Sequence, residues 1–263
     1  MKKIVSVLLA TLMMVTLLAG CSSQKEDWAY IEDKGTLVIG ITLYEPMNYY
    51  DEEGNLTGFD TEFAEAVCEK LGVEPVFQVI EWDQKEFELQ SKSIDCIWNG
   101  LTVTEERKED MAFSTSYVEN MQVVVINKDN ADTYKTIEDF TDITICAESG
   151  SAGQSAIEDD ATLSTNEFVG VSAQKDGLLE VKSGTCEACV LDWVLARAVI
   201  TEDTDYSDLM VVEGIELAKE EYAIGLRLED AQTLEMINKA IAELMEDGTM
   251  QELGEKYGVN VVY

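Results

Sequence analysis

The sequence predicts an α/β protein built as two lobes with a cleft between them. Short apolar runs alternate with amphipathic helices along most of the chain, an order that favours sheets whose strands are mostly parallel. The alternation occurs as two successive series, which extended segments near 117–121 and 216–220 join. The 263 residues, 46% of them hydrophobic, are enough to bury two cores.

The N-terminal segment has the pattern of an export signal. Lys2 and Lys3 precede an apolar run over 4–18, which is short for a membrane span and typical of a signal peptide. We therefore expect residues 1–20 to be a signal peptide that forms no part of the fold.

The end of this segment, Leu17-Leu18-Ala19-Gly20-Cys21, resembles the cleavage box of bacterial lipoproteins. The resemblance implies that Cys21 carries lipid and that 21–27 form the lipid anchor and tether. The chain would then be attached to the extracytoplasmic face of the cell membrane. A plain secretory signal is the alternative.

The first series begins with a buried strand over 36–41 and a hairpin-type turn at 51–55. Asp60 is predicted to cap the next helix, whose apolar residues recur every four positions until Gly72 ends it. The series closes with a strand over 76–80, a helix ending at 91 and a strand over 94–99.

The second series contains four strands, with helices between them and after them. The strands are predicted over 122–127, 143–147, 168–171 and 188–191, and the helices start at 151, start at 173 and cover 193–200. A strand over 221–227 and helices over 233–245 and 250–257 close the chain.

This order of elements divides the chain into interleaved parts. We expect lobe 1 to comprise 28–117 plus 221–263, and lobe 2 to comprise 122–215. Residues 118–121 and 216–220 would then form two hinge strands that connect the lobes.

The composition excludes several functions. The formal charge is −35, and without the two signal lysines it is −37, from 16 basic and 53 acidic residues. Nucleic-acid binding needs clustered basic residues and is not expected. The chain has no histidine, so Ser–His and Cys–His nucleophiles and His-ligated zinc are excluded. We expect no cofactor, no metal, no catalytic residues and a monomer.

Five cysteines remain besides Cys21, and most lie in apolar strand or helix contexts, where a thiol behaves as a small hydrophobic group. They are Cys68, Cys96, Cys146, Cys186 and Cys189. The pair Cys186 and Cys189 forms a CxxC pattern, but it runs into a strand and does not open a helix, as a redox motif would. Whether any of the five form disulfides stays open.

The segment 99–117, NGLTVTEERKEDMAFSTSY, contains a set of residues suited to binding an anion. Arg107 offers a planar fork of donors that matches a carboxylate, and Thr102 adds a short hydroxyl donor nearby. The alternative is an ordinary strand–loop–helix with a surface arginine.

The chain resembles the polar amino-acid-binding lipoproteins of ABC importers, extracellular solute-binding protein family 3, which have a type II periplasmic-binding-protein fold. The similarity rests on several motifs taken together. These motifs are GNLTGFD at 54–60, LQSKSID at 89–95, GLTVTEER at 100–107, Phe113-Ser114 with Tyr117, Ser149-Gly150-Ser151, Asp192 and Asp247-Gly248-Thr249.

The resemblance implies a clamp for the carboxylate of an amino acid. Arg107 and Thr102 would bind it, assisted by the backbone amides of Ser151 and Ala152 at a helix start. Family members often have a hydroxyl residue where Ala152 stands, so only its amide would remain. For Thr102, the alternative is a satisfied hydroxyl at a strand end.

The resemblance also implies a site for the α-ammonium group. Asp192 would bind it, together with Thr102 and the carbonyl of Gly100. The alternative for Asp192 is the N-cap of the helix that begins at Trp193.

Aromatic residues would enclose the aliphatic part of the ligand. Tyr44 and Trp82 match the wall positions of the family, and plain core packing is the alternative for both. Asn99 is assigned to the pocket floor, whereas Trp98 should point the opposite way, into the core.

The side chain of the ligand is less well determined. Family members that bind basic amino acids tend to carry an acid at the position of Ile41. The isoleucine here counts against recognition of lysine or arginine by a residue at this position. Glu148 could face the ligand and favour a positive or amide group, or it could be one more solvated acid. We expect a polar or neutral amino acid.

Together these features indicate a lipid-anchored protein that captures a free amino acid by closing its lobes and delivers it to an ABC permease. Two alternatives remain. The protein could sense an amino acid and signal to a membrane partner, or it could be a dehydratase on the same fold.

Overall fold

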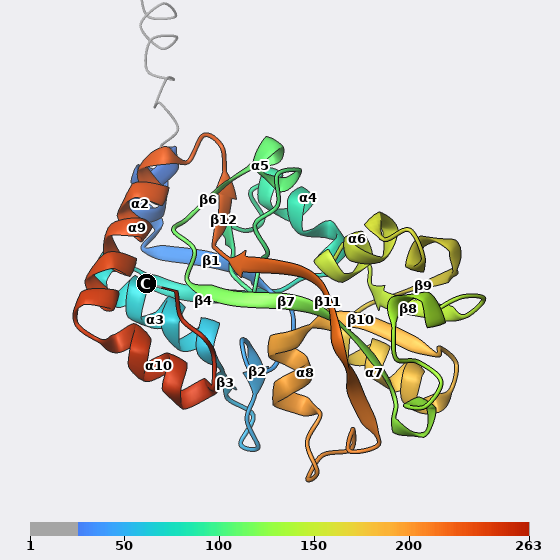
Figure 1. Ribbon diagram of the computed structural model, residues 1–263. Helices are drawn as coiled ribbons and strands as arrows, with labels where there is room; N and C mark the ends of the chain where they lie inside the picture. Colours follow the sequence, from blue (N-terminus) through green and yellow to red (C-terminus); the bar gives the residue numbers. More distant parts are fainter. Residues whose placement is uncertain (1–25, 263) are drawn as a thin grey trace, which may run out of the picture.

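The structure is a computed structural model that describes residues 26–262. It contains two five-stranded sheets, one in each lobe, and helices cover them (Figure 1). The predicted α/β class and the two-lobed arrangement are therefore confirmed. The predicted signal peptide and Cys21 lie outside the described residues.

Lobe 1 is built on a sheet with the strand order β4-β1-β5-β12-β6. Strand β1 runs parallel to β4 and β5, whereas β12 is antiparallel to β5 and β6. The strands are β1 (Thr36–Ile41), β4 (Glu74–Val79), β5 (Cys96–Ile97), β6 (Met111–Phe113) and β12 (Gly225–Arg227).

Helices from both ends of the described chain belong to lobe 1, where they contact the sheet or one another (Figure 1). They are α2 (Asp27–Lys34), α3 (Phe59–Leu71), α4 (Lys85–Gln90), α5 (Arg107–Asp110), α9 (Ala231–Glu246) and α10 (Thr249–Tyr257), with the short hairpin β2 (Tyr49–Tyr50) and β3 (Leu56–Thr57) and the 3-10 turn η1 (Trp82–Gln84).

Lobe 2 is built on a sheet with the strand order β11-β7-β10-β8-β9. Strands β10, β8 and β9 are parallel to one another, and β7 is antiparallel to both of its neighbours. The elements are β7 (Val118–Asn127), β8 (Thr144–Glu148), β9 (Glu167–Val171), β10 (Ala188–Asp192), β11 (Leu209–Tyr222), α6 (Ala152–Asp159), α7 (Gln174–Ser183), α8 (Trp193–Val199), η2 (Lys128–Asn130), η3 (Ile137–Asp139) and η4 (Leu163–Thr165).

Strands β7 and β11 also connect the lobes. They lie side by side as a long antiparallel pair that crosses the middle of the molecule (Figure 1). The predicted hinge segments form the start of β7 and the later part of β11, where Asn120 pairs with Glu220. Two chain segments that cross between the lobes side by side are suited to a bending motion between the lobes.

The core of lobe 1 contains a cluster of aromatic side chains beneath α3. Phe63 contacts the ring of Trp98 edge-on at 4.9 Å between centroids and that of Tyr117 at 5.2 Å. All three side chains are fully buried. The assignment of Trp98 to the core is therefore confirmed.

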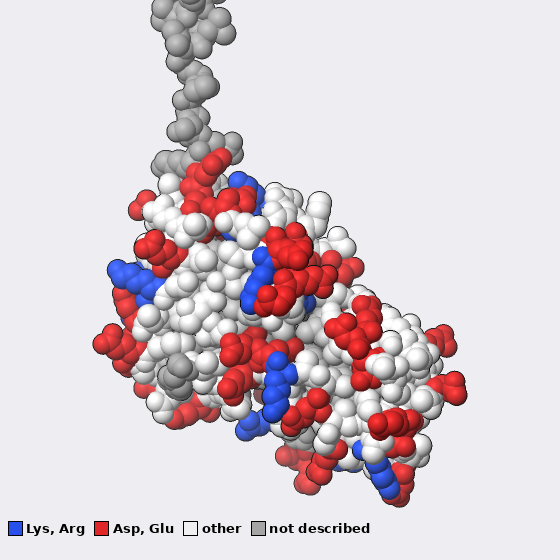
Figure 2. All heavy atoms as spheres, turned by 45° about the horizontal axis from the view of Figure 1, so that its top comes forward, with Lys and Arg blue, Asp and Glu red and all other residues white. Residues whose placement is uncertain are grey.

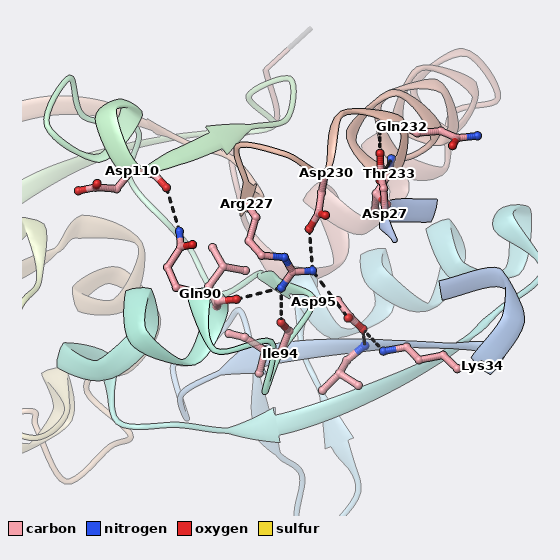
Figure 3. A network of polar contacts seen from close by, with 12 residues as sticks. Asp27, Lys34, Gln90, Ile94, Asp95, Asp110, Arg227, Asp230, Gln232 and Thr233 are labelled. Carbon is pink, nitrogen blue, oxygen red and sulfur yellow. Dashed lines mark hydrogen bonds and ion pairs between the residues drawn. The ribbon is translucent and has the colours of Figure 1, made fainter. Parts of the chain in front are cut away.

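A buried ionic network joins α2, β12 and α9 in lobe 1 (Figure 3). Arg227 pairs with Asp230 at 2.6 Å and donates to the carbonyls of Leu89 and Ile94. Asp95 lies 4.0 Å from the Arg227 guanidinium. These bonds connect β12, the last strand in the sequence, to the loop that leads into β5.

The same region holds the N-terminus of α9. The carboxylate of Asp27 accepts the N–H groups of Gln232 and Thr233, both at 2.7 Å (Figure 3). Burial would raise the pKa of Asp27, but hydrogen bonds from Thr233 and Gln232 outweigh it and lower the pKa. A residue more than 200 positions away thus caps this helix.

Two predictions about local structure are wrong. Asp60 does not cap α3, because Gly58 holds the N-cap position and the Asp60 carboxylate accepts the N–H of Gly100 at 2.7 Å. The strand predicted over 221–227 is divided, because β11 ends at Tyr222 in one sheet and β12 begins at Gly225 in the other.

The five cysteines of the described chain are free, and all are buried. The Cys186–Cys189 pair therefore forms no disulfide in this structure. Among residues 26–262, no helix combines the length and apolar character that a membrane span requires. Acidic side chains are spread widely over the face shown in Figure 2, and few basic ones lie among them.

Candidate ligand-binding site

A small cavity lies where the two lobes meet, and we call it the cleft cavity. Its empty space, including the part that opens to solvent, is about 270 Å³. Its lining consists of Thr42, Tyr44, Trp82, Asn99, Gly100, Thr102, Arg107, Glu148, Ser151, Ala152, Gln174 and Asp192. All ten binding residues predicted from the sequence belong to this lining, and Thr42 and Gln174 are additional.

The topology explains why these residues meet. Parallel strands present their carboxyl ends at one edge of a sheet, where ligands bind in open α/β folds. Thr42 follows β1 and Trp82 follows β4 in lobe 1, whereas Glu148 ends β8 and Asp192 ends β10 in lobe 2. The cleft cavity thus lies between two such edges.

Arg107 provides a positive charge on the lobe 1 side. It begins α5, and its Nη1 donates to the carbonyl of Thr102 at 2.8 Å. Its Nη2 donates to the carbonyl of Gly150 in lobe 2 at 3.2 Å. These bonds use two of the five N–H donors of the guanidinium and fix its plane at the cavity.

Gly100 and Thr102 shape the wall next to Arg107. Gly100 has φ of +56°, and a Cβ atom there would lie 2.5 Å from the Tyr44 ring. Only glycine allows the chain to pass so close to that ring. The hydroxyl of Thr102 donates to Oε1 of Glu220 at 2.9 Å.

Asp192 provides a negative charge on the lobe 2 side. Its Oδ1 accepts hydrogen bonds from Asn120 and Gln122, both at 2.6 Å, and its Oδ2 accepts one from Gln174. Asp192 occupies the N-cap position of α8, but its side chain makes no capping bond. Asn120 accepts the Val194 N–H instead, at 3.2 Å.

Glu220 is a residue that the sequence analysis missed. It lies on β11 in the predicted hinge, and its Oε1 accepts from Asn120 and Gln122, the same amides that bind Asp192. Burial raises the pKa of Glu220 to about 7, and the negative charge of Asp192 adds to the effect. Among 53 acidic residues, nothing in the sequence distinguishes this one.

The helix start at α6 differs from the prediction in one detail. The N–H of Ser151 is not open to a ligand, because it donates to the carbonyl of Glu148 at 3.1 Å in a tight turn. The Ser151 hydroxyl caps the helix by accepting the N–H of Gln154. Ala152 is the first residue of α6, where a backbone N–H has no partner within the helix.

Two aromatic side chains form walls of the cavity, as predicted for the positions of Tyr44 and Trp82. The Tyr44 hydroxyl bonds to that of Tyr222 at 2.6 Å, which fixes its ring. Nζ of Lys85 lies 5.0 Å from the centroid of the Trp82 ring. Both walls are buried and also pack against the core of lobe 1.

Asn99 lines the cavity, but its amide is fully engaged. Oδ1 accepts from the N–H and the hydroxyl of Thr42, and Nδ2 donates to the Thr42 carbonyl and to Asn48. Its amide therefore holds the end of β1 in place and has no donor left for a ligand.

Contacts between the lobes hold the cleft closed in this structure. The carbonyl of Gly150 accepts hydrogen bonds from Lys85 at 2.9 Å and from Arg107 at 3.2 Å. Further out, Lys175 of lobe 2 pairs with Glu45 of lobe 1 at 3.0 Å. Each contact joins groups that an opening motion would separate.

Comparisons with known proteins agree with this architecture. The model of the bacterial extracellular solute-binding proteins, family 3, matches residues 37–260. The L-cystine-binding protein TcyJ of Escherichia coli (strain K12) is 29% identical over 231 residues, which cover 86% of this chain and 84% of TcyJ.

Two solved structures are similar across nearly the whole described chain. Tv2483 bound to L-arginine is 29% identical with a TM-score of 0.83, covering 89% of this chain and 95% of its own. An ABC uptake transporter substrate-binding protein from Streptococcus pneumoniae with bound histidine is 32% identical with a TM-score of 0.81, covering 88% and 95%. The predicted type II periplasmic-binding-protein fold is confirmed.

Proposed function

Because the chain belongs to the bacterial extracellular solute-binding proteins of family 3, we propose that it binds a free amino acid in the cleft cavity and delivers it to the permease of an ABC importer. The similar proteins named above bind L-cystine, L-arginine and histidine. All three ligands share an α-carboxylate and an α-ammonium group.

One observation supports this function more than any other. Arg107 of lobe 1 and Asp192 of lobe 2 line the same small cavity and carry opposite charges. A zwitterion could pair its carboxylate with Arg107 and its ammonium with Asp192, and charge-assisted hydrogen bonds of this kind are strong. The N–H of Ala152 would add a donor for the carboxylate.

Binding would be coupled to closure of the lobes. Because the two charged residues belong to different lobes, a ligand that contacts both has more contacts in the closed form than in the open form. It shifts the population towards closure by the difference between its two affinities. The contacts of Lys85 and Arg107 with Gly150 would add to the closed form.

The anchor and the partner are also part of the proposal. Cys21 follows a lipoprotein-type signal, so lipid on this residue would keep the protein at the extracytoplasmic membrane face, close to a permease. The similar protein of Streptococcus pneumoniae is a component of an ABC uptake transporter. Mass spectrometry of the protein from cells would test for a lipid at Cys21.

A screen of the purified protein against the twenty amino acids and cystine tests the function. A ligand that binds only the folded state raises the melting temperature. We expect at least one amino acid to do so, with stoichiometric binding and no turnover. The absence of a shift with all of them would contradict the proposal and point to another class of solute.

The variant Arg107→Ala provides the second test. We expect the affinity for the best amino acid to fall by about 100-fold or more, because a charge-assisted bidentate contact is lost. The ligand-free melting temperature should change little, since Arg107 is half-buried and supports no core. Titration calorimetry measures this, and retained micromolar binding would overturn the assignment.

A further inference from the structure

Glu148 lines the cleft cavity, but no hydrogen-bond donor of the described residues contacts its Oε1. It ends β8 and is only 3% exposed. Buried carboxylate oxygens are almost always hydrogen-bonded, so an unpartnered one at a cavity indicates a partner that arrives with the ligand.

The other two acids of the site differ from Glu148 in this respect. Asp192 accepts hydrogen bonds from three side-chain amides. Glu220 accepts from two amides and from the hydroxyl of Thr102. The amide donors around the cavity are therefore arranged for these two acids, and none of them reaches Glu148.

No cation of residues 26–262 neutralises Glu148 through an ion pair. The charge of Lys85 acts on Glu148, but its Nζ contacts the carbonyls of Gly150 and Trp82 and the carboxylate of Glu86. Arg107 donates one hydrogen bond each to the carbonyls of Thr102 and Gly150, and the proposed function assigns its remaining N–H groups to the ligand carboxylate. Both cations thus have other partners.

The balance of charge points to the class of ligand. Three carboxyl groups, those of Glu148, Asp192 and Glu220, lie at or next to the cavity, against the cations Arg107 and Lys85. When all three carboxyl groups are ionised, they exceed the two cations by one charge. A neutral zwitterion leaves this balance unchanged, whereas an amino acid with a positive side chain supplies the missing charge and favours the ionised form of Glu148.

We propose that the ligand is an amino acid with a cationic side chain and that Glu148 binds its ammonium or guanidinium group. The inference rests on the proposed function, because it takes the α-groups to be bound by Arg107 and Asp192. The acid for the side chain then comes from lobe 2, whereas the position expected to carry one in lobe 1 holds Ile41, a core residue.

The protonation of Glu148 supports this assignment. The pKa of its carboxyl group is raised to about 8, mainly by burial and in second place by the charge of Asp192 on β10. Lys85 on α4 lowers it, while Asp176 on α7 and Glu81 before η1 raise it. A bound cation would favour the ionised form, so Glu148 would release its proton to the buffer when the ligand binds.

Titration calorimetry of the purified protein with matched ligands tests the inference. L-arginine and L-lysine are compared with L-citrulline and L-norleucine, which have nearly the same shape without the charge. We expect at least one cationic amino acid to bind about tenfold or more tightly than its neutral counterpart. At neutral pH the measured enthalpy should depend on the buffer, because a proton is released.

The variant Glu148→Gln should reduce this preference about tenfold or more and abolish the dependence on buffer. Asp83→Asn, which changes an exposed acid next to the wall residue Trp82, is the matched control and should leave both unchanged. Thermal unfolding without ligand checks that each variant is folded.

The outcomes separate the two proposals. Equal or tighter binding of the neutral ligands, a preference for cystine over both cationic ligands, or an unchanged preference in Glu148→Gln would overturn the inference. The proposed function would survive these results as long as the binding depends on Arg107. If no amino acid binds at all, both proposals fail.

Discussion

At the scale of single residues, the position of Gly100 shows how tightly the cavity wall is built. A Cβ atom at this position would lie 2.5 Å from a ring carbon of Tyr44 and 3.1 Å from Tyr222. The two tyrosines are held together by the bond between their hydroxyl groups, so neither can easily move away.

We therefore predict that Gly100→Ala lowers stability by about 1–3 kcal/mol and weakens amino-acid binding about tenfold or more. Gly72→Ala is the control, because Gly72 has a similar φ of +72° but no atom within 4 Å of a new Cβ. Urea unfolding and calorimetry measure the two effects. Equal losses in both variants would show that backbone strain, and not the ring, is responsible.

Three buried acids make the ligand-free protein sensitive to pH. Burial raises the pKa of Asp60 to about 7, of Glu220 to about 7 and of Glu148 to about 8. Each value lies above that of the unfolded chain, so the folded protein binds more protons between about pH 4 and 8. The free energy of unfolding should therefore fall as pH rises through this window.

Calorimetry should find a melting temperature several degrees lower at about pH 8 than at about pH 5.5. The double variant Glu148→Gln/Glu220→Gln should reduce this dependence, because the two amides do not titrate and only Asp60 of the three acids remains. A wild-type melting temperature that rises over the same range would contradict the assignment of these groups.

The sequence predicted which residues line the cavity better than it predicted the hydrogen bonds that these residues make. The ten predicted binding residues all line one cavity, because their motifs lie at the ends of strands that the topology brings together. The partners of those residues could not be predicted. Asn120 bonds to Asp192 and Glu220 bonds to Thr102 from the crossing strands, across 72 and 118 positions of sequence.

At the scale of elements, strands with continuous apolar runs were predicted well. The strand expected over 36–41 is β1 without any shift, and Gly72 ends α3 in the left-handed conformation. Some short elements were missed, among them β6 and the helix α2. Their stability comes from contacts with distant segments, which local patterns do not contain.

The segment after residue 208 shows the same limitation. Strand β11 covers 14 residues, and its pairing with β7 is interrupted by shifts in register around Glu216. Its consecutive charged residues Lys219-Glu220-Glu221 are typical of a solvent-exposed segment. In the protein, however, Glu220 turns inward, where amide groups of β7 bind it.

The element β12 depends on the buried ionic network of Figure 3. Arg227 is 3% exposed, and its removal would leave Asp230 without its cation. We predict that Arg227→Met lowers the free energy of unfolding by about 3–5 kcal/mol, since an uncompensated buried charge is costly. Ligand affinity should not change, because the network lies outside the cleft cavity.

Urea unfolding measures this loss, and the double variant Arg227→Met/Asp230→Asn is its control. The second substitution removes the stranded carboxylate and should recover part of the stability. A loss below about 1 kcal/mol in the single variant would show that the network contributes little.

At the scale of the whole molecule, closure depends on a few polar contacts between the lobes. The Gly150 carbonyl is the common acceptor for Lys85 and Arg107. Lys85 is almost fully buried, whereas the pair formed by Lys175 and Glu45 is more exposed and should contribute less.

We predict that Lys85→Met shifts the ligand-free protein towards open forms, because the side chain keeps its length but loses the hydrogen bond to Gly150. Small-angle X-ray scattering should then give a larger radius of gyration than for the wild type, and saturating ligand should reduce the difference. Lys175→Met is the control and should have a weaker effect. An unchanged radius in Lys85→Met would show that the hydrogen bond from Lys85 to Gly150 does not hold the lobes closed.

The position of β12 has a consequence for the way the chain acquires its structure. This strand lies inside the lobe 1 sheet, between β5 and β6, although it is synthesised more than 110 residues after them. Lobe 2, in contrast, draws its strands from one continuous stretch of chain. Pairing over long sequence separations is slow, so lobe 2 is expected to fold first and lobe 1 only once the C-terminal segment is present.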